Sequence, residues 1–94
     1  MGGGGSLSGG IWETVGNVGD LPSTWFPNSR FDLRNSAGQR TQQRWFGPDG
    51  RATRNRDWSH GNRGGGHRFP HDHRWNWNNI PPRGRPENVD PWAN

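Results

Sequence analysis

Hydrophobic and polar positions alternate in the middle of the chain. In the stretch RFDLR, Phe31 and Leu33 are separated and flanked by charged residues. A period of two predicts a strand with one buried face. The polar stretches QRTQQRWF at 39–46 and RATRNRDW at 51–58 predict two more strands. We therefore expect an antiparallel β-meander over residues 30–58.

Two turns separate the three predicted strands. NSAG connects the first to the second, and GPDG connects the second to the third. Pro48-Asp49-Gly50 fits a type I turn closed by a left-handed glycine, which is a common hairpin connection. The units AGQRTQQRWF and DGRATRNRDW repeat with a period of 12 residues, each a turn followed by an Arg-rich strand. This repeat supports the hairpin interpretation.

The flanking segments are rich in glycine and proline. Residues 1–10 have the composition of a flexible Gly/Ser linker, and we exclude them from the fold. Residues 11–80 are expected to form one small tryptophan-anchored domain, with a short strand or helical turn over 11–18. Residues 81–94 are expected to be a Pro-rich extended tail. The predicted fold is a small single domain, mainly β, with antiparallel hairpins, long irregular Gly/Pro-rich segments and little helix.

Composition limits the number of domains, the residues available for a core and the kinds of stabilising bond. At 94 residues there is room for one domain, and only 24% of residues are hydrophobic, so we expect the seven tryptophans to supply the core. The chain has no cysteine, which excludes disulfides and thiolate zinc sites. No stretch approaches the roughly 18 apolar residues of a membrane span. The expected core tryptophans are Trp12, Trp25, Trp45, Trp58, Trp75, Trp77 and Trp92.

The basic residues are all arginine, with twelve Arg, no Lys and a formal net charge of +4. Arginine grips phosphate bidentately and stacks on bases, so this composition is compatible with nucleic-acid contact. In the register set by a three-residue loop, four arginines fall on one face of the hairpin. Such a face either holds a nucleic-acid backbone or is an ordinary solvated surface, partly neutralised by Asp32 and Asp57. The four residues are Arg40, Arg44, Arg54 and Arg56.

All four histidines fall within 14 positions, at His60, His67, His71 and His73. The last two are two residues apart, so on an extended segment they point to the same side. Two imidazoles in one pocket can hold opposite protonation states and exchange protons with a substrate. They can also ligate a metal together with another histidine and Asp57 or Asp72. Packing of His against Trp is the structural alternative.

Acid–base chemistry suits RNA, because the 2′-hydroxyl is the nucleophile and arginine can hold the charged phosphate. We therefore expect His60, His71 and His73 to be catalytic, with Asp57 fixing the tautomer of His60. Trp75 is a candidate platform for stacking a base. No metal is expected, since the spacing matches no common zinc pattern. The alternative metal set is zinc held by His67, His71 and His73.

The run from RWFGPDGRATRNRDWSHGN to HRFPHDHRWNW resembles the C-terminal toxin modules of bacterial polymorphic toxins. A strand pair with a DG turn is followed by the WSHGN and PHDHRW segments, over roughly residues 44–77. The resemblance implies a module of a larger secreted protein that is delivered into the cytoplasm of a target cell and bound by a cognate immunity protein. The positions that match are Asp57, His60, Gly61, Asn62, Pro70, His71 and His73.

Two functions from different classes follow from these patterns. One is a metal-independent ribonuclease toxin, in which histidines transfer protons while Arg54 and Arg56 hold phosphate. The other is a non-catalytic module, either a nucleic-acid binder or a domain stapled by a His-bound metal. The clustered histidines, the one-sided arginines and the toxin-like segment all agree with the ribonuclease. Nucleic acid (RNA first) and an immunity protein are the expected partners, and no membrane is expected.

Overall fold

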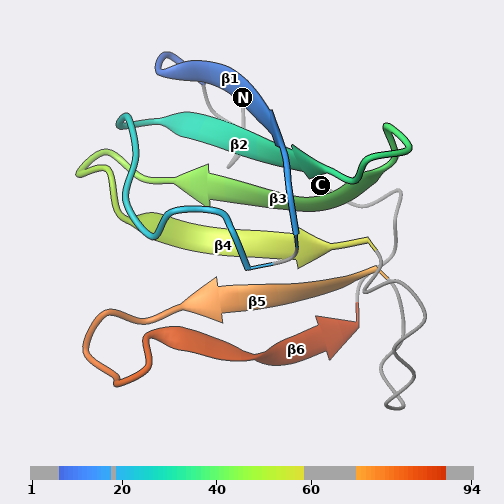
Figure 1. The fold of residues 1–94 in the computed structure, drawn as a ribbon. Coiled ribbons are helices and arrows are strands. Elements are labelled where there is room, and N and C mark those ends of the chain that lie inside the picture. The colour runs from blue at the N-terminus through green and yellow to red at the C-terminus, as the bar shows by residue number, and fades with distance from the viewer. Residues whose placement is uncertain (1–6, 18, 59–69, 89–94) are drawn as a thin grey trace.

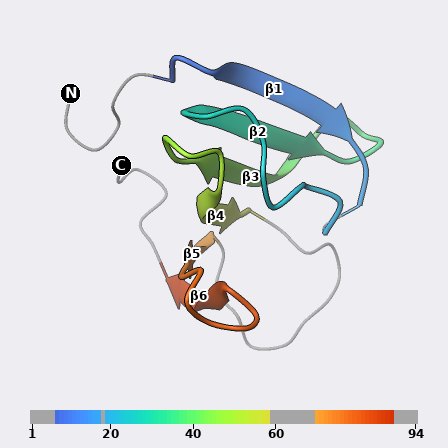
Figure 2. The same ribbon diagram turned by 90° about the vertical axis from the view of Figure 1, so that its left-hand side faces the viewer.

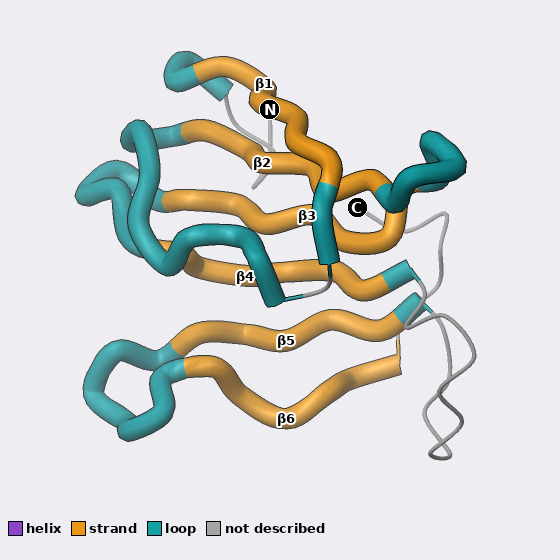
Figure 3. The backbone as a smooth tube through the Cα atoms, viewed as in Figure 1, coloured by secondary structure: helices purple, strands orange, loops and turns teal. Residues whose placement is uncertain are grey.

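The computed structural model describes residues 7–17, 19–58 and 70–88. These residues form one six-stranded sheet in which the strands follow one another in chain order (Figure 1, Figure 3). β1 runs parallel to β2, and all other neighbours are antiparallel. No helix among the described residues is long and apolar enough to span a membrane. The strands are β1 (Gly10–Val15), β2 (Ser29–Arg34), β3 (Arg40–Phe46), β4 (Ala52–Asp57), β5 (His71–Trp75) and β6 (Arg83–Asn88).

The predicted small, mainly β domain and its meander are confirmed. β2, β3 and β4 coincide with the three predicted strands to within a residue or two at their ends. The turn between β3 and β4 is closed by the Gly50 N–H, which donates to the Gly47 carbonyl at 2.9 Å. Gly50 has a φ of 82°, the left-handed conformation that the sequence predicts for it.

The flanking segments contribute more structure than the sequence predicts. β1 confirms the strand alternative predicted for residues 11–18, and it begins one residue earlier, at Gly10, inside the expected linker. Residues 1–6 lie outside the described part of the chain. β6 lies in the expected tail and pairs with β5 (Figure 1). Proline is compatible with β6 because this strand is at the edge of the sheet. One side of an edge strand has no neighbouring strand, so a missing N–H on that side costs no hydrogen bond between strands.

The sheet is strongly twisted, so that β5 and β6 are rotated relative to β1 and β2 (Figure 2). We call the face that carries Phe31 and Leu33 the inner face, and the opposite one the outer face. The segment between β1 and β2 contributes Leu21 and Trp25 to the inner face. The buried core is small: Leu21, Phe31, Leu33, Phe46 and Ala52, with Trp25 and Trp75 packed against it.

The prediction that all tryptophans form the core is therefore wrong for several of them. Trp12 is 40% exposed and Trp77 is 36% exposed. Trp45 and Trp58 are half-buried on the outer face, where the guanidinium carbons of Arg54 and Arg40 lie 4.0 and 4.5 Å from their ring centroids. Cation–π contact with arginine thus replaces burial in an apolar core for these indoles. Trp92 lies outside the described residues.

Two irregularities in pairing decide which arginines share a face. Trp45 pairs with Arg54 but Phe46 pairs with Ala52, so Thr53 is an extra residue on β4. Thr41 is likewise extra on β3, opposite the step from Leu33 to Arg34. Each bulge shifts the alternation of side chains by one residue. As a result the sequence-based register, which places all four arginines on one face, is wrong. Arg44 lies on the inner face, whereas Arg40, Arg54 and Arg56 lie on the outer face.

Two turn glycines give a matched test of the β3–β4 connection. Gly50 and Gly38 have nearly the same φ, 82° and 83°. A Cβ on Gly50 would lie 2.7 Å from the Trp25 carbonyl oxygen, whereas one on Gly38 would meet nothing within 4 Å. We expect Gly38→Ala to lower the free energy of unfolding by about 1 kcal/mol, the strain of a left-handed alanine. Gly50→Ala should cost at least about 1 kcal/mol more, because backbone must also move. Urea unfolding curves measure both, and equal losses would contradict the steric argument.

Candidate functional site

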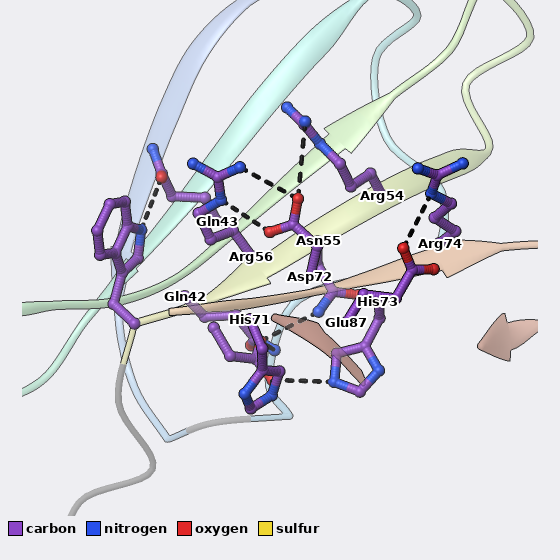
Figure 4. A network of polar contacts seen from close by, with 12 residues as sticks. Gln42, Gln43, Arg54, Asn55, Arg56, His71, Asp72, His73, Arg74 and Glu87 are labelled. Carbon is purple, nitrogen blue, oxygen red and sulfur yellow. Dashed lines mark hydrogen bonds and ion pairs between the residues drawn. The ribbon is translucent and has the colours of Figure 1, made fainter. Parts of the chain in front are cut away.

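The polar inner-face residues form two rows across the sheet. One row runs through Arg44, Asn55 and His73 on β3, β4 and β5, and the other through Gln42, Asp57 and His71. Figure 4 shows His71 and His73 on the same side of β5, while Asp72 between them points to the side of Arg54 and Arg56. The predicted common orientation of His71 and His73 is thus confirmed, with ring centroids 5.1 Å apart.

Asp57 is the centre of this cluster. Gln42 Nε2 and Asn55 Nδ2 donate to its Oδ1 at 2.8 and 3.1 Å. Its Oδ2 lies 3.2 Å from His71 Nε2 and 3.3 Å from His73 Nε2. The side chains of His71 and Asp57 are 1% and 3% exposed. The carboxylate is therefore held in one orientation, with one oxygen aimed at both imidazoles.

His73 is also fixed from its other side. Its Nδ1 lies 2.7 Å from the Gly84 carbonyl oxygen, which can only accept, so Nδ1 carries the hydrogen and Nε2 faces Asp57. Burial acts to lower the pKa of His73. The hydrogen bonds to Asp57 and Gly84 and the Asp57 charge outweigh burial and the opposing charge of Arg83, so the pKa is raised above 6.5.

A cleft of about 490 Å³ adjoins this cluster, and His73 is one of its lining residues. The segment between β1 and β2 borders it with Leu21 and Ser23, the connection from β5 to β6 borders it with residues 81–82, and β6 borders it with Gly84. Arg44, Arg83 and Trp75 also line it. The cleft therefore brings two guanidiniums, an indole and the imidazole of His73 together.

Arg44 is buried beside the cleft. Its Nη1 donates to the carbonyl oxygens of Leu21 at 2.7 Å and Pro22 at 3.1 Å. Its Nε is buried and has no hydrogen-bond partner among the described residues. Burial and then the charge of Arg83 lower the pKa of Arg44 to about 10, against a smaller raising effect of Asp57. The guanidinium remains charged at neutral pH and is only partly satisfied by the protein.

The remaining predicted phosphate-binding arginines lie on the opposite face of the sheet from His71 and His73. Arg56 donates to Asp72 through Nε at 2.7 Å and Nη2 at 3.1 Å, and Arg54 Nη1 is 3.7 Å from the same carboxylate. Arg40 stacks on Trp58. These contacts belong to the outer face, so these three arginines and His73 do not line one pocket.

Trp75 is half-buried, and its ring is already in contact with two side chains. The Arg44 guanidinium carbon lies 4.9 Å from its ring centroid, and Trp77 stacks on it at 5.6 Å. Its Nε1 donates to Asn55 Oδ1 at 2.8 Å. Trp75 thereby links the cleft to the Asp57 cluster, and its base-stacking role stays a prediction.

Several predicted residues cannot be placed. His60, Gly61, Asn62 and His67 lie outside the described residues. Among the described residues, Asp57, His71 and His73 could together hold a metal ion, because their ligand atoms all lie within 4.8 Å of one another. Asp57 thus stands where the alternative zinc set has His67.

Sequence reasoning missed four partners of the site: Gln42, Asn55, Arg83 and Gly84. The alternation of hydrophobic and polar residues is what assigns the buried face of a strand. Gln42 and Asn55 are polar residues on a buried face, so they interrupt this alternation and cannot be recognised from it. Arg83 and Gly84 belong to β6, which was not predicted as a strand because its segment is rich in proline.

Comparisons with known proteins give no relative. No family model, no curated protein and no solved structure matches the chain. The resemblance to polymorphic toxin modules therefore rests on the motif residues alone.

Proposed function

We propose that this protein cleaves RNA in the cleft beside Asp57, His71 and His73, as the toxin module of a larger secreted protein. The observation that carries this proposal is that His73 lines the same cleft as Arg44 and Arg83. A site for nucleic-acid cleavage needs cationic groups for phosphate and a titratable or metal-binding group beside them. The cleft offers both.

The charge of the cleft favours an anionic substrate. Within the described part of the chain, neither Arg44 nor Arg83 forms an ion pair with a carboxylate. Burial, and after it the charge of Arg83, lowers the pKa of Arg44 to about 10, so the two cations repel each other. An anion between them would relieve this repulsion, and guanidinium groups bind phosphate oxygens bidentately. A phosphodiester fits this arrangement better than a neutral ligand.

RNA suits the site because it supplies its own nucleophile. The 2′-oxygen attacks phosphorus, the bond to the 5′-oxygen breaks, the 2′-hydroxyl loses its proton and the 5′-oxygen gains one. Arg44 and Arg83 would stabilise the negative charge that grows on the phosphoryl oxygens. The Asp57 cluster would assist the reaction in one of two ways. His73 would exchange a proton with the 2′- or 5′-oxygen, or a metal bound by the cluster would stabilise the charge on the phosphate.

The exposure of the two histidines favours different roles for them, instead of the proton exchange by two imidazoles that the sequence suggests. The side chain of His71 is 1% exposed, whereas that of His73 is 10% exposed and lines the cleft. His71 would therefore act on the substrate only through Asp57 or a metal. Delivery, an immunity protein and action in a target cell remain proposals from the motif resemblance.

Arg83→Gln tests the role of the cleft, because this side chain is exposed and its replacement should leave the fold intact. A hydrogen bond to a charged group is worth about 1.5–3 kcal/mol, so kcat/KM for RNA should fall about 10- to 100-fold. Because Arg83 is assigned to charge that grows in the transition state, the loss should appear in kcat as well as in KM. Arg74→Gln is the matched control, since Arg74 is 79% exposed and pairs with Glu87 on the outer face. Equal kcat/KM values for both variants and the unchanged protein would contradict the cleft as the binding site.

A further inference from the structure

We propose that Asp57, His71 and His73 bind one zinc-class divalent ion, such as Zn²⁺ or Co²⁺. The three donor atoms are Asp57 Oδ2 and the Nε2 atoms of the two histidines, which converge from β4 and β5. The proposal concerns binding alone and does not rest on RNA cleavage.

All three donor atoms lie within 4.8 Å of one another, and the two distances from the carboxylate oxygen fit a metal site. Zinc bonds of about 2.0–2.1 Å to nitrogen and about 2.0–2.2 Å to oxygen place neighbouring tetrahedral ligand atoms about 3.3–3.5 Å apart. Asp57 Oδ2 is 3.2 Å from His71 Nε2 and 3.3 Å from His73 Nε2. In this structure the His71–Asp57 contact is a hydrogen bond, whose proton an incoming metal ion would displace.

The partners behind the donors also fit a metal site. A ligating histidine commonly donates its other ring N–H to a carbonyl or carboxylate, which fixes the tautomer. The Gly84 carbonyl does this for His73, so Nε2 is the nitrogen that binds a cation once its proton is released. Gln42 and Asn55 hold Asp57 Oδ1, so Oδ2 is the oxygen turned toward the imidazoles.

The donor set selects the class of ion. Two imidazoles with one carboxylate suit zinc and its neighbours in the first transition row, whereas calcium and magnesium prefer oxygen ligands alone. Three protein ligands are the number found at catalytic zinc sites, where the remaining position is left to water or substrate. Within the proposed function, such an ion would supply Lewis-acid stabilisation of the phosphodiester.

Calorimetric titration of EDTA-treated protein with Zn²⁺, repeated with Co²⁺ under absorption spectroscopy, tests the site without substrate. We expect one ion per chain, a rise in melting temperature and a Co²⁺ spectrum of low coordination number with nitrogen and oxygen ligands. His71→Ala and Asp57→Asn should each weaken binding by at least about 100-fold, and Glu87→Gln should not change it.

Two results would overturn the proposal. One is a folded wild-type protein that binds neither ion saturably, and the other is a Co²⁺ spectrum typical of the hexa-aqua ion. If the His71 and Asp57 variants fail to fold, the stoichiometry and Co²⁺ spectrum of the wild-type protein still show whether the ion binds at this site. A protein that binds the ion but leaves RNA intact would uphold this site and contradict only the proposed function.

Discussion

Replacing His73 by alanine is expected to lower the rate of RNA cleavage by at least about 100-fold, the usual contribution of a positioned acid–base group. His73 is the described histidine that lines the cleft, and it touches both Asp57 and the Gly84 carbonyl. Alanine removes a proton donor if the cluster acts through protons, and a ligand if it acts through a metal. Initial rates on an RNA oligonucleotide at saturating substrate measure the loss.

The neighbouring Arg74 supplies the control for this variant. It follows His73 on β5, is 79% exposed and belongs to the outer face, so Arg74→Ala should cleave at nearly the unchanged rate. If His73→Ala does not fold, His73→Gln carries the same expectation, because an amide can still donate to Gly84. A folded His73 variant with full activity would contradict the assignment of the cleft as the active site.

Replacing Asp72 by alanine is expected to lower the free energy of unfolding by about 3–5 kcal/mol, the cost of breaking a buried ion pair. The Arg56–Asp72 contact measures 2.7 Å, and both side chains are 8% exposed. Removing the carboxylate leaves the guanidiniums of Arg54 and Arg56 side by side on the outer face. Urea unfolding followed by tryptophan fluorescence gives the value.

The exposed pair on the same face is the matched control. Arg74 and Glu87 lie 3.5 Å apart, with side chains 79% and 50% exposed, so Glu87→Ala should cost about 0–1 kcal/mol. The double replacement Arg56→Met with Asp72→Leu should regain most of the stability that Asp72→Ala loses. If Asp72→Ala costs no more than Glu87→Ala, the outer-face pair does not stabilise the sheet as proposed.

The sequence predicts the hairpin well because local chemistry dictates it. Pro48-Asp49-Gly50 determines a turn whose geometry depends on a few adjacent residues, and Gly50 adopts the expected positive φ. The common orientation of His71 and His73 is equally local, since it follows from alternation within one strand. Both predictions needed no information about distant parts of the chain.

The faces of the sheet could not be predicted, because one bulge reverses them. An extra residue at Thr53 places Arg44 opposite Asn55 instead of Arg54. A threonine in a polar strand carries no signal for this change. The bulge also brings Asp57 to the inner face beside His71, and thereby creates the cluster.

The β5–β6 half of the site was hidden for a different reason. Pro81, Pro82 and Pro86 argue against a strand locally, yet an edge strand tolerates proline. The pairing of β4 with β5 joins segments on either side of residues 59–69, and no local pattern specifies that register. Asp57, His73 and Arg83 therefore become neighbours only through tertiary structure.

Cleavage of a single RNA oligonucleotide tests the central claim most directly. The folded wild-type protein, after EDTA treatment and again after loading with Zn²⁺, is incubated with the RNA and with a copy that carries one 2′-deoxy nucleotide at the cleaved position. We expect cleavage of the RNA in at least one of these states, with a 2′,3′-cyclic phosphate as first product and loss of that cleavage in the deoxy copy. RNA that stays intact in both states would contradict it.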